Sequence, residues 1–370
     1  FPKLCPPTCG LEINFRRIKD NPRIKVLTLA KVEKVDGTPG NYDVTIKVAP
    51  RYVNENCTCC GDCAEACQTE IDSDFDFGMK KVKGAYLPFE MAFPARFVIS
   101  PEIIGSDDAQ RCKDACKYDA VDLEMEAKTL NFNVGSIVWA TGWEPYDATK
   151  IDNLGFGQYP NIITNMMMER LASPNGPTKG KIVRPSDDKA PESIAFVQCA
   201  GSRDENHLPY CSYICCMASL KQATYVRERY PDAKIYVFYI DLRTPGLRYE
   251  RFYEQIKKDE NIFLIKGKVA EVSEDPTNKN ISVVAENAVT GEKIHQTVEM
   301  VVLATGMQPT AATTKLPADL TYNDDGFIIN DFETGGMFAA GCANKPADVV
   351  SSNQNATGMA LKAIQTLVNR

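Results

Sequence analysis

The chain has 370 residues, of which 25% are charged and 44% are hydrophobic, and its formal net charge is −7. A length of this order suits two or three globular domains. The negative balance argues against nucleic-acid binding, which needs a basic stripe, and no apolar run is long enough to cross a membrane. Any membrane contact is therefore expected to come through a partner.

Cysteine is abundant and histidine is nearly absent. The chain has 14 cysteines but only two histidines, His207 and His295. A Ser-His-Asp site or a His-rich zinc site is hard to build from so few histidines, so any metal is expected to be held by sulfur. Residues 1–5 lack the runs of a secretory signal, and clustered thiols without an export signal favour a reducing compartment. Because the first residue is Phe1 rather than Met, the natural protein is expected to begin further upstream.

The first part of the chain predicts a hairpin followed by a segment of different character. Two strands are expected at 24–35 and 42–48, joined by a turn rich in Gly, Pro and Asn. Residues 51–125 are rich in cysteine and loops and only weakly periodic. An apolar strand that runs into a glycine turn follows at 136–142.

The second part alternates strands with helices. A helix is expected at 163–172, and a Pro- and Gly-rich loop at 173–191. The elements expected after it are a strand at 194–198, a helix at 212–229, strands at 234–240, 262–269, 281–285, 301–304 and 337–340, and a helix at 353–369. This alternation predicts an α/β fold with parallel sheets.

One short pattern occurs twice in the sequence. An apolar strand is followed by Ala-Thr-Gly at 140–142 and again at 304–306. Short apolar strands that end in glycine are common by chance, but a pair of them, each at the place expected for a turn of a Rossmann-type half, makes chance a poorer explanation. We interpret the pair as two equivalent turns.

The spacing Cys57-x2-Cys60-x2-Cys63-x3-Cys67 is typical of a bacterial ferredoxin. Three thiolates on one tight loop bind three irons of a cubane, and the fourth cysteine reaches a different cluster. The usual proline after the last cysteine is replaced by Gln68. Structural zinc is the alternative, but zinc prefers two separated cysteine pairs.

A second ferredoxin run survives only in part. Counting back from Cys112-x3-Cys116, its two earlier positions fall on Ser106 and Ala109, and alanine is unable to bind iron. One cluster is therefore predicted here, with Cys67 and Cys112 left over. Its predicted ligands are Cys57, Cys60, Cys63 and Cys116. A set with Cys67 in place of Cys116 is the open alternative.

Four more thiols gather in the β-α-β unit of residues 194–241. A nucleotide-binding unit carries G-x-G-x-x-G at this point, yet only Gly201 remains of it here. The carboxyl ends of parallel strands are where α/β sheets bind ligands, so a metal cluster is predicted in place of the nucleotide. Its candidate ligands are Cys199, Cys211, Cys215 and Cys216.

Several segments together resemble one known family, the HdrA-like flavoproteins related to the A subunit of heterodisulfide reductase. The segments that carry the resemblance are 1–19 (FPKLCPPTCGLEINFRRIK), 50–63, 137–146 (IVWATGWEPY), 195–222 and 338–350. The most specific is 199–217. Within the family, the sequence is most similar to the branch found in quinone-interacting membrane-bound oxidoreductase (Qmo) complexes of sulfate reducers.

The resemblance implies a thioredoxin-reductase-like fold with two Rossmann-type domains and an inserted ferredoxin-like domain. The FAD domain is expected to comprise 1–50, 131–165 and 301–370. The ferredoxin-like insertion is expected at 51–130, and the second Rossmann-like domain at 166–300. The family's G-x-G-x-x-G is absent from the sequence and is expected upstream of Phe1.

The resemblance also implies the cofactors, which are FAD and two 4Fe–4S clusters, one of them a non-standard cluster on the thiols of 199–216. The FAD contacts that it implies are Val32, Thr141, Gly142, Thr305, Gly306, Gly341, Cys342 and Asp348. Cys342 stands where related flavoproteins usually have an aspartate, and Asp348 is the candidate substitute. Cys5 and Cys9 are a candidate redox pair near the flavin.

By this resemblance, the chain is an electron-transfer subunit that links the quinone pool to adenylylsulfate reductase. It is expected in the cytoplasm, at the inner face of the membrane, through a second HdrA-like flavoprotein and a haem-containing membrane subunit. One alternative is a heterodisulfide-reductase A subunit that splits electron pairs at its flavin. Others are an NAD(P)H-dependent disulfide reductase, which the missing phosphate loop disfavours, and a non-redox scaffold with structural zinc.

Overall fold

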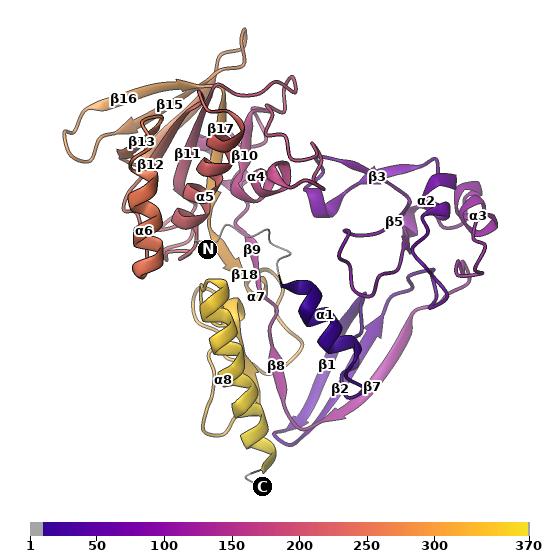
Figure 1. Ribbon diagram of the computed structural model, residues 1–370. Helices are drawn as coiled ribbons and strands as arrows, with labels where there is room; N and C mark the ends of the chain where they lie inside the picture. Colours follow the sequence, from indigo (N-terminus) through magenta and orange to yellow (C-terminus); the bar gives the residue numbers. More distant parts are fainter. Residues whose placement is uncertain (1–9, 369–370) are drawn as a thin grey trace. The chain divides into compact units, whose positions relative to one another are not determined.

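The computed structural model describes residues 10–368 and divides into two compact units (Figure 1). Within these residues, unit 1 comprises 38–41 and the chain from Gly135 onward. Unit 2 comprises 10–37 and 42–134.

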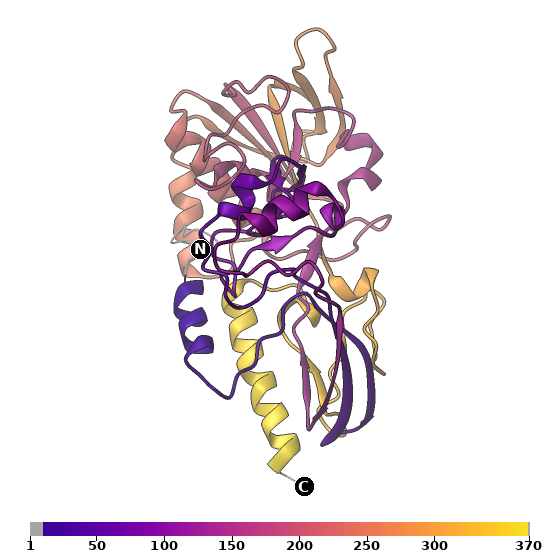
Figure 2. The same cartoon turned by 90° about the vertical axis from the view of Figure 1, so that its right-hand side faces the viewer.

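Unit 2 is built on an antiparallel sheet of order β1-β2-β7, whose strands lie side by side in both views (Figures 1 and 2). The strands are β1 (Ala30–Thr38), β2 (Asn41–Val48) and β7 (Lys128–Val134). The prediction of a strand from residue 24 is wrong, because Leu29 has a φ of 53° and interrupts the extended backbone there. Helix α1 (Leu11–Lys19) was not expected, and it has no buried residue whose spacing would reveal it.

The cysteine-rich part of unit 2 consists of short elements around a small core. They are α2 (Asp62–Ala66), β3 (Glu70–Asp72), η1 (Asp74–Asp76), β4 (Lys81–Lys83), β5 (Ala85–Tyr86), β6 (Val98–Ile99), η2 (Pro101–Ile103) and α3 (Asp107–Asp114). The core contains Val53, Ile99 and Ile103, together with buried cysteines. Because the segment has little apolar surface of its own, thiols fill part of its interior.

Unit 1 contains a five-stranded sheet of order β10-β17-β11-β12-β13, in which every neighbouring pair is parallel. The strands are β10 (Ile162–Thr164), β11 (Ser193–Ala200), β12 (Lys234–Tyr239), β13 (Ile262–Lys266) and β17 (Met300–Thr305). The helices between them are α4 (Asn165–Ala172), α5 (Cys215–Arg229) and α6 (Leu247–Ile256). This sheet and its crossover helices confirm the predicted α/β fold.

The rest of unit 1 consists of smaller sheets and one long helix. One antiparallel sheet contains β14 (Val269–Glu274), β15 (Ile281–Glu286) and β16 (Lys293–Val298). Strand β8 (Ile137–Trp139) pairs in parallel with β19 (Met337–Ala339). Strand β9 (Trp143–Pro145) pairs with β18 (Met307–Pro309). Short turns are η3 (Ala148–Lys150), η4 (Asp152–Leu154), α7 (Thr310–Thr313) and η5 (Gly341–Ala343). Helix α8 (Val349–Val368) packs on β8 and β19. Over residues 10–368, no helix is both long and apolar enough to span a bilayer.

The compact units do not follow the predicted domain boundaries. Most of the segment assigned to the first part of the FAD domain, 1–50, belongs to unit 2, whereas 131–165 and 301–370 belong largely to unit 1. The reason is that β2 pairs along its whole length with β7, which follows the cysteine-rich region. The functional assignment of these segments stays a prediction.

Candidate redox centres

The first thiol set lines one small cavity of unit 2. The cysteines on its wall are Cys57, Cys60, Cys63 and Cys116. Neither Cys67 nor Cys112 lines it. The cavity lies at the start of α2, where Gly61 with a φ of 93° turns the chain into the helix. Four sulfur donors around one space suit an iron–sulfur cluster, and the cavity favours the ligand set that contains Cys116.

The electrostatic environment explains why this set needs a cation. Burial raises the pKa of the Cys63 thiol to about 12, and the nearby thiols of Cys57, Cys116 and Cys60 act in the same direction. The thiolate form, which binds metal, is therefore unfavourable at neutral pH unless positive charge enters the cavity. Iron ions would supply that charge.

The leftover thiols lie buried beside this cavity. Cys67 donates from Sγ to Asp108 Oδ2 at 3.5 Å, and Cys112 donates to the carbonyl of Cys63 at 3.3 Å. Ala109, which would have to be a second-cluster ligand, has no exposed surface. Ser106 accepts from the Ala109 N–H at 3.4 Å as the N-cap of α3. Cys67, Ala109 and Cys112 are thus part of the buried core of unit 2, and the loss of a second ferredoxin-type cluster stays a prediction.

Asp108 provides a pH-dependent link between these segments. Burial alone would raise its pKa, but hydrogen bonds from the N–H groups of Gln68 and Thr69, at 2.9 and 2.6 Å, and from Arg111 hold the pKa well below its usual range. Stability from the ionised carboxylate is present above the unfolded-state pKa of about 4 and is lost as the pH falls toward the lower folded-state value.

Asp108→Asn should therefore be most destabilising near neutral pH. The difference in unfolding free energy between wild type and variant is expected to shrink as the pH falls from about 5 toward 2, because the wild-type carboxylate becomes protonated. Urea unfolding at several pH values measures this difference. A difference that stays constant over this range would contradict the assigned role.

The second thiol set meets at the carboxyl edge of the parallel sheet in unit 1. Cys199 is the last residue but one of β11, where the register with β17 shifts between Val197 and Ala200, and its φ is 58°. Cys215 and Cys216 form the first turn of α5, which begins at residue 215 rather than at the predicted 212 because Tyr213 has a φ of 69°. Cys211 lies in the loop before the helix.

The four thiols interact with one another and with positive groups. Burial raises the pKa of Cys215 to about 12; the Ser212 hydroxyl opposes the shift, and Cys216, Cys199 and Cys211 add to it. The amino end of α5 favours negative charge at its first turn. The Arg203 guanidinium attracts the Cys199 thiolate, and it is anchored by donating to Asp241 Oδ2 at 3.1 Å.

This donor set fits a sulfur-held cluster. Within residues 10–368, no three or more His, Cys, Asp or Glu side chains are close enough together to hold a metal ion as they stand, so the assignment of either thiol set rests on the chemistry of its donors. Four thiols in a positively polarised setting at a strand edge are a donor set of the kind that binds an iron–sulfur centre.

The two Ala-Thr-Gly turns differ in the structure. The Thr141 hydroxyl is buried without a partner among the described residues, and Gly142 has a φ of 73° with open space where a side chain would begin. The Thr305 hydroxyl donates to Asn165 Oδ1 at 3.1 Å, and a Cβ on Gly306 would lie 2.5 Å from Leu208 Cδ1. Only the first turn therefore offers a free polar atom and room for a cofactor.

Other candidate FAD residues line an apolar cavity of about 350 Å³ in unit 1. Its wall includes Cys342, Asp348 and Trp143, as well as Ile214 and Met217, which flank the two cysteines of α5. Asp348 Oδ2 accepts from the Tyr249 hydroxyl at 3.1 Å, and Gly341 donates its N–H to Asn355. Apolar walls with a few polar groups suit a flavin ring.

Of the predicted FAD residues, Cys342 and Asp348 are the two that line this cavity. Val32 lies on β1, in unit 2. Cys5 and Cys9 fall outside the described residues, so their role stays a prediction.

A buried ion pair beneath the second thiol set was not expected from the sequence. Lys221 on α5 has 7% of its side chain exposed, and its Nζ lies 3.0 Å from Glu169 Oε1 on α4. Gln222 donates to the same carboxylate at 3.1 Å and to the Asn165 carbonyl at 2.9 Å. Because the pair joins two helices far apart in sequence, no local motif indicates it.

Glu169→Ala should destabilise the protein strongly. The change buries the Lys221 ammonium without its carboxylate, at an expected cost of about 3–5 kcal/mol in unfolding free energy. Glu254→Ala is the matched control, because Glu254 pairs with Lys257 at 3.1 Å with both side chains about half exposed, and its expected cost is about 0–1 kcal/mol. Denaturant unfolding of both variants checks the prediction, and equal losses would contradict it.

No protein-family model matches the chain. The chain is 38% identical, over 379 residues, to the second iron-sulfur A subunit of CoB–CoM heterodisulfide reductase from Methanopyrus kandleri, covering 99% of this chain and 58% of that relative. The chain is a homologue of heterodisulfide reductase A subunits. The predicted resemblance to the HdrA-like family is thereby confirmed.

A second relative of this HdrA-like chain is the A subunit of the H(2):CoB-CoM heterodisulfide,ferredoxin reductase from Methanothermobacter thermautotrophicus, 34% identical over 380 residues. This alignment covers 100% of the chain and 57% of the relative. The HdrA-like chain thus spans a little over half the length of these relatives. Among solved structures, it is similar to thioredoxin reductase of Lactococcus lactis, with 15% identity, a TM-score of 0.43, and coverage of 78% of this chain and 86% of that one.

Proposed function

We propose that this chain is the flavin- and cluster-carrying electron-transfer subunit of a heterodisulfide-reductase-type oxidoreductase complex. The observation that carries the proposal is the second thiol set at the carboxyl edge of the parallel sheet, at the position where a Rossmann-type unit holds a nucleotide phosphate. Homology to A subunits, one of which is named an iron-sulfur subunit, supports it.

The chain's own residues would hold and insulate the redox groups. When bound, FAD and 4Fe–4S clusters supply two-electron and one-electron chemistry, respectively. The two thiol sets would bind one cluster each. The first turn of α5 and the Arg203 guanidinium would stabilise the negative charge of the second cluster. The apolar cavity at Cys342 would exclude water around the flavin ring.

The name of one heterodisulfide reductase relative also suggests that electrons from the flavin follow two routes. One relative's name couples a heterodisulfide and a ferredoxin. We extend this to the chain as a proposal that its flavin splits electron pairs between two routes. Its partners would then be a disulfide-reducing subunit together with the other members of such a complex.

A second candidate is the quinone-linked role in sulfate reduction. The observation in its favour is the lost cluster position, where buried Ala109 and the N-cap Ser106 leave a single ferredoxin-type site. In that case, the partners would be adenylylsulfate reductase, a second HdrA-like flavoprotein and a haem-containing membrane subunit, with the complex at the inner face of the membrane. Electron transfer from a quinol through the intact complex, with no activity on a heterodisulfide, would favour this candidate over the first.

The test is the iron, sulfide and flavin content of the intact protein. About eight irons and one FAD per chain are expected from two cubanes. About four irons would mean that one thiol set does not bind a cluster. Zinc without visible iron–sulfur absorbance would overturn the proposal. Bleaching of the flavin by NADPH would instead favour a free-standing disulfide reductase.

A further inference from the structure

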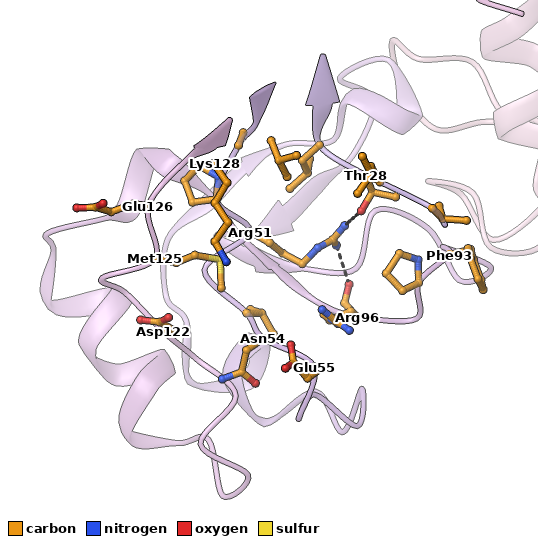
Figure 3. A pocket seen from close by; sticks show the side chains of 18 of the residues that line it. Thr28, Arg51, Asn54, Glu55, Phe93, Arg96, Asp122, Met125, Glu126 and Lys128 are labelled. Carbon is orange, nitrogen blue, oxygen red and sulfur yellow. Dashed lines mark hydrogen bonds between the residues drawn. The ribbon is translucent and has the colours of Figure 1, made fainter. Parts of the chain in front are cut away.

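Unit 2 contains a cavity of about 820 Å³ whose wall includes none of the residues predicted to bind FAD or a cluster (Figure 3). It lies between the end of α1, the residues that lead into β1, and the beginning and end of the cysteine-rich region. Its volume falls within the range of small-molecule sites.

Two arginines face this cavity together. Arg51 donates from Nη2 to Thr28 Oγ1 at 2.6 Å and from Nη1 to the carbonyl of Arg96 at 3.3 Å. These bonds fix the Arg51 guanidinium and bring the Arg96 backbone against it, as the dashed lines in Figure 3 show. In the part of the chain that the structure describes, neither arginine forms an ion pair with a carboxylate.

This arrangement has an electrostatic cost that an anion would relieve. Burial and the positive charge of Arg96 lower the pKa of Arg51, and the nearby thiol of Cys57 only partly offsets them. Arg51 has N–H groups beyond the two that it donates to Thr28 and to the Arg96 carbonyl, and these groups and the Arg96 side chain are donors of the kind that binds a phosphate group.

The remaining walls suit a ring and its polar substituents. Phe93 and Pro94 both line the cavity, and Figure 3 shows Phe93 near Thr28. Asp122 and Glu126 lie on the opposite side, away from Phe93. Glu55, which Figure 3 shows beside Arg96, and Glu124 also line the cavity, and such carboxylates accept hydrogen bonds from hydroxyl or amino groups.

We propose that this cavity binds an organic phosphate of nucleotide size, with its phosphate on Arg51 and Arg96 and its ring against Phe93 and Pro94. The site goes beyond the proposed electron-transfer function. It lies beside Arg51, whose charge also interacts with a predicted cluster ligand, Cys57. A bound phosphate and the cluster would therefore share the same positive charge.

The test is calorimetric titration of the full chain, loaded with flavin and iron, with AMP, adenosine and inorganic phosphate. AMP is expected to bind, and adenosine is expected to bind at least about tenfold more weakly, because charge-assisted hydrogen bonds to the phosphate are lost. Inorganic phosphate, which lacks the ring, is expected to bind more weakly than AMP. Arg51→Gln and Arg96→Gln should each weaken AMP binding by at least about tenfold.

Arg17→Gln is the control, because Arg17 is an exposed α1 residue that does not line the cavity. Should Arg51→Gln fail to fold, Arg96→Gln still tests the site, because over residues 10–368 the contact between Arg96 and Arg51 is made by the Arg96 backbone carbonyl and not by its side chain. Equal binding of AMP and adenosine, or AMP binding that neither variant weakens, would overturn the proposal. So would AMP binding only to flavin-free protein with displacement by FAD, because the cavity would then belong to the flavin's own nucleotide half. An unchanged iron and flavin content alongside any of these results leaves the electron-transfer function intact.

Discussion

Cys215→Ala is expected to remove about four of the roughly eight irons bound per chain, since one cubane is lost when a ligand is missing. Cys215 is buried in the first turn of α5, and its Sγ lies 3.6 Å from the Thr305 carbonyl oxygen. No water therefore has ready access to replace it as a ligand. Iron and acid-labile sulfide analysis measures the loss, and electron paramagnetic resonance of the reduced protein should show one cluster signal fewer.

Cys342→Ala is the matched control in the same unit. Cys342 is also buried, and its thiol donates to the Ala347 carbonyl at 3.4 Å, but it belongs to the apolar cavity and not to the thiol set. Its iron content should equal that of the wild type. If both variants keep all iron, the second thiol set is not a cluster site, and the proposed function loses its main support.

The second large effect concerns which cysteine completes the first cluster. Cys116→Ala should remove about four irons, and Cys67→Ala should remove none. The reason is geometric. Cys116 lines the same cavity as Cys57, Cys60 and Cys63. Cys67 does not line that cavity, and its thiol donates to Asp108 instead. The same iron and sulfide assay, run on both purified variants, distinguishes them.

Stability has to be measured alongside this comparison. Cys67 is 2% exposed and packs in the core of unit 2, so its truncation will lower the unfolding free energy even if no iron is lost. Cys112→Ala, which changes a buried thiol of the same core, provides the reference for this packing effect. Loss of iron from Cys67→Ala with retention in Cys116→Ala would establish the alternative ligand set.

The sequence predicted the central β-α-β unit well, because its strands are continuous apolar runs and its helix is long. Errors occurred where backbone conformation rather than hydrophobicity decides the boundary. Leu29 and Tyr213 both have positive φ angles, and each sets the start of an element later than the apolar pattern suggests. Strand β16 was missed because its residues are mostly exposed or half-buried, which leaves a weak pattern.

In the candidate sites, too, features that depend on local sequence were predicted, and features that depend on contacts between distant segments were not. Clustered thiols are local in sequence, so their spacing indicated the chemistry directly, and Cys116 was reached through ferredoxin spacing. The Lys221–Glu169 pair and the Arg51–Arg96 contact join distant segments, and neither leaves a local pattern. The unequal roles of the two Ala-Thr-Gly turns depend on the packing of Leu208 against Gly306, which the sequence repeat does not reveal.

The register shift in β11 has a consequence for how the protein matures. Pairing with β17 is regular up to Val197 and is restored at Ala200, so Cys199 lies in a gap of the hydrogen-bond ladder. The sheet is therefore able to form completely before any iron arrives. Delivery of the proposed cluster would then require only the short bulge and the loop before α5 to rearrange, so we expect metal insertion to follow formation of the sheet.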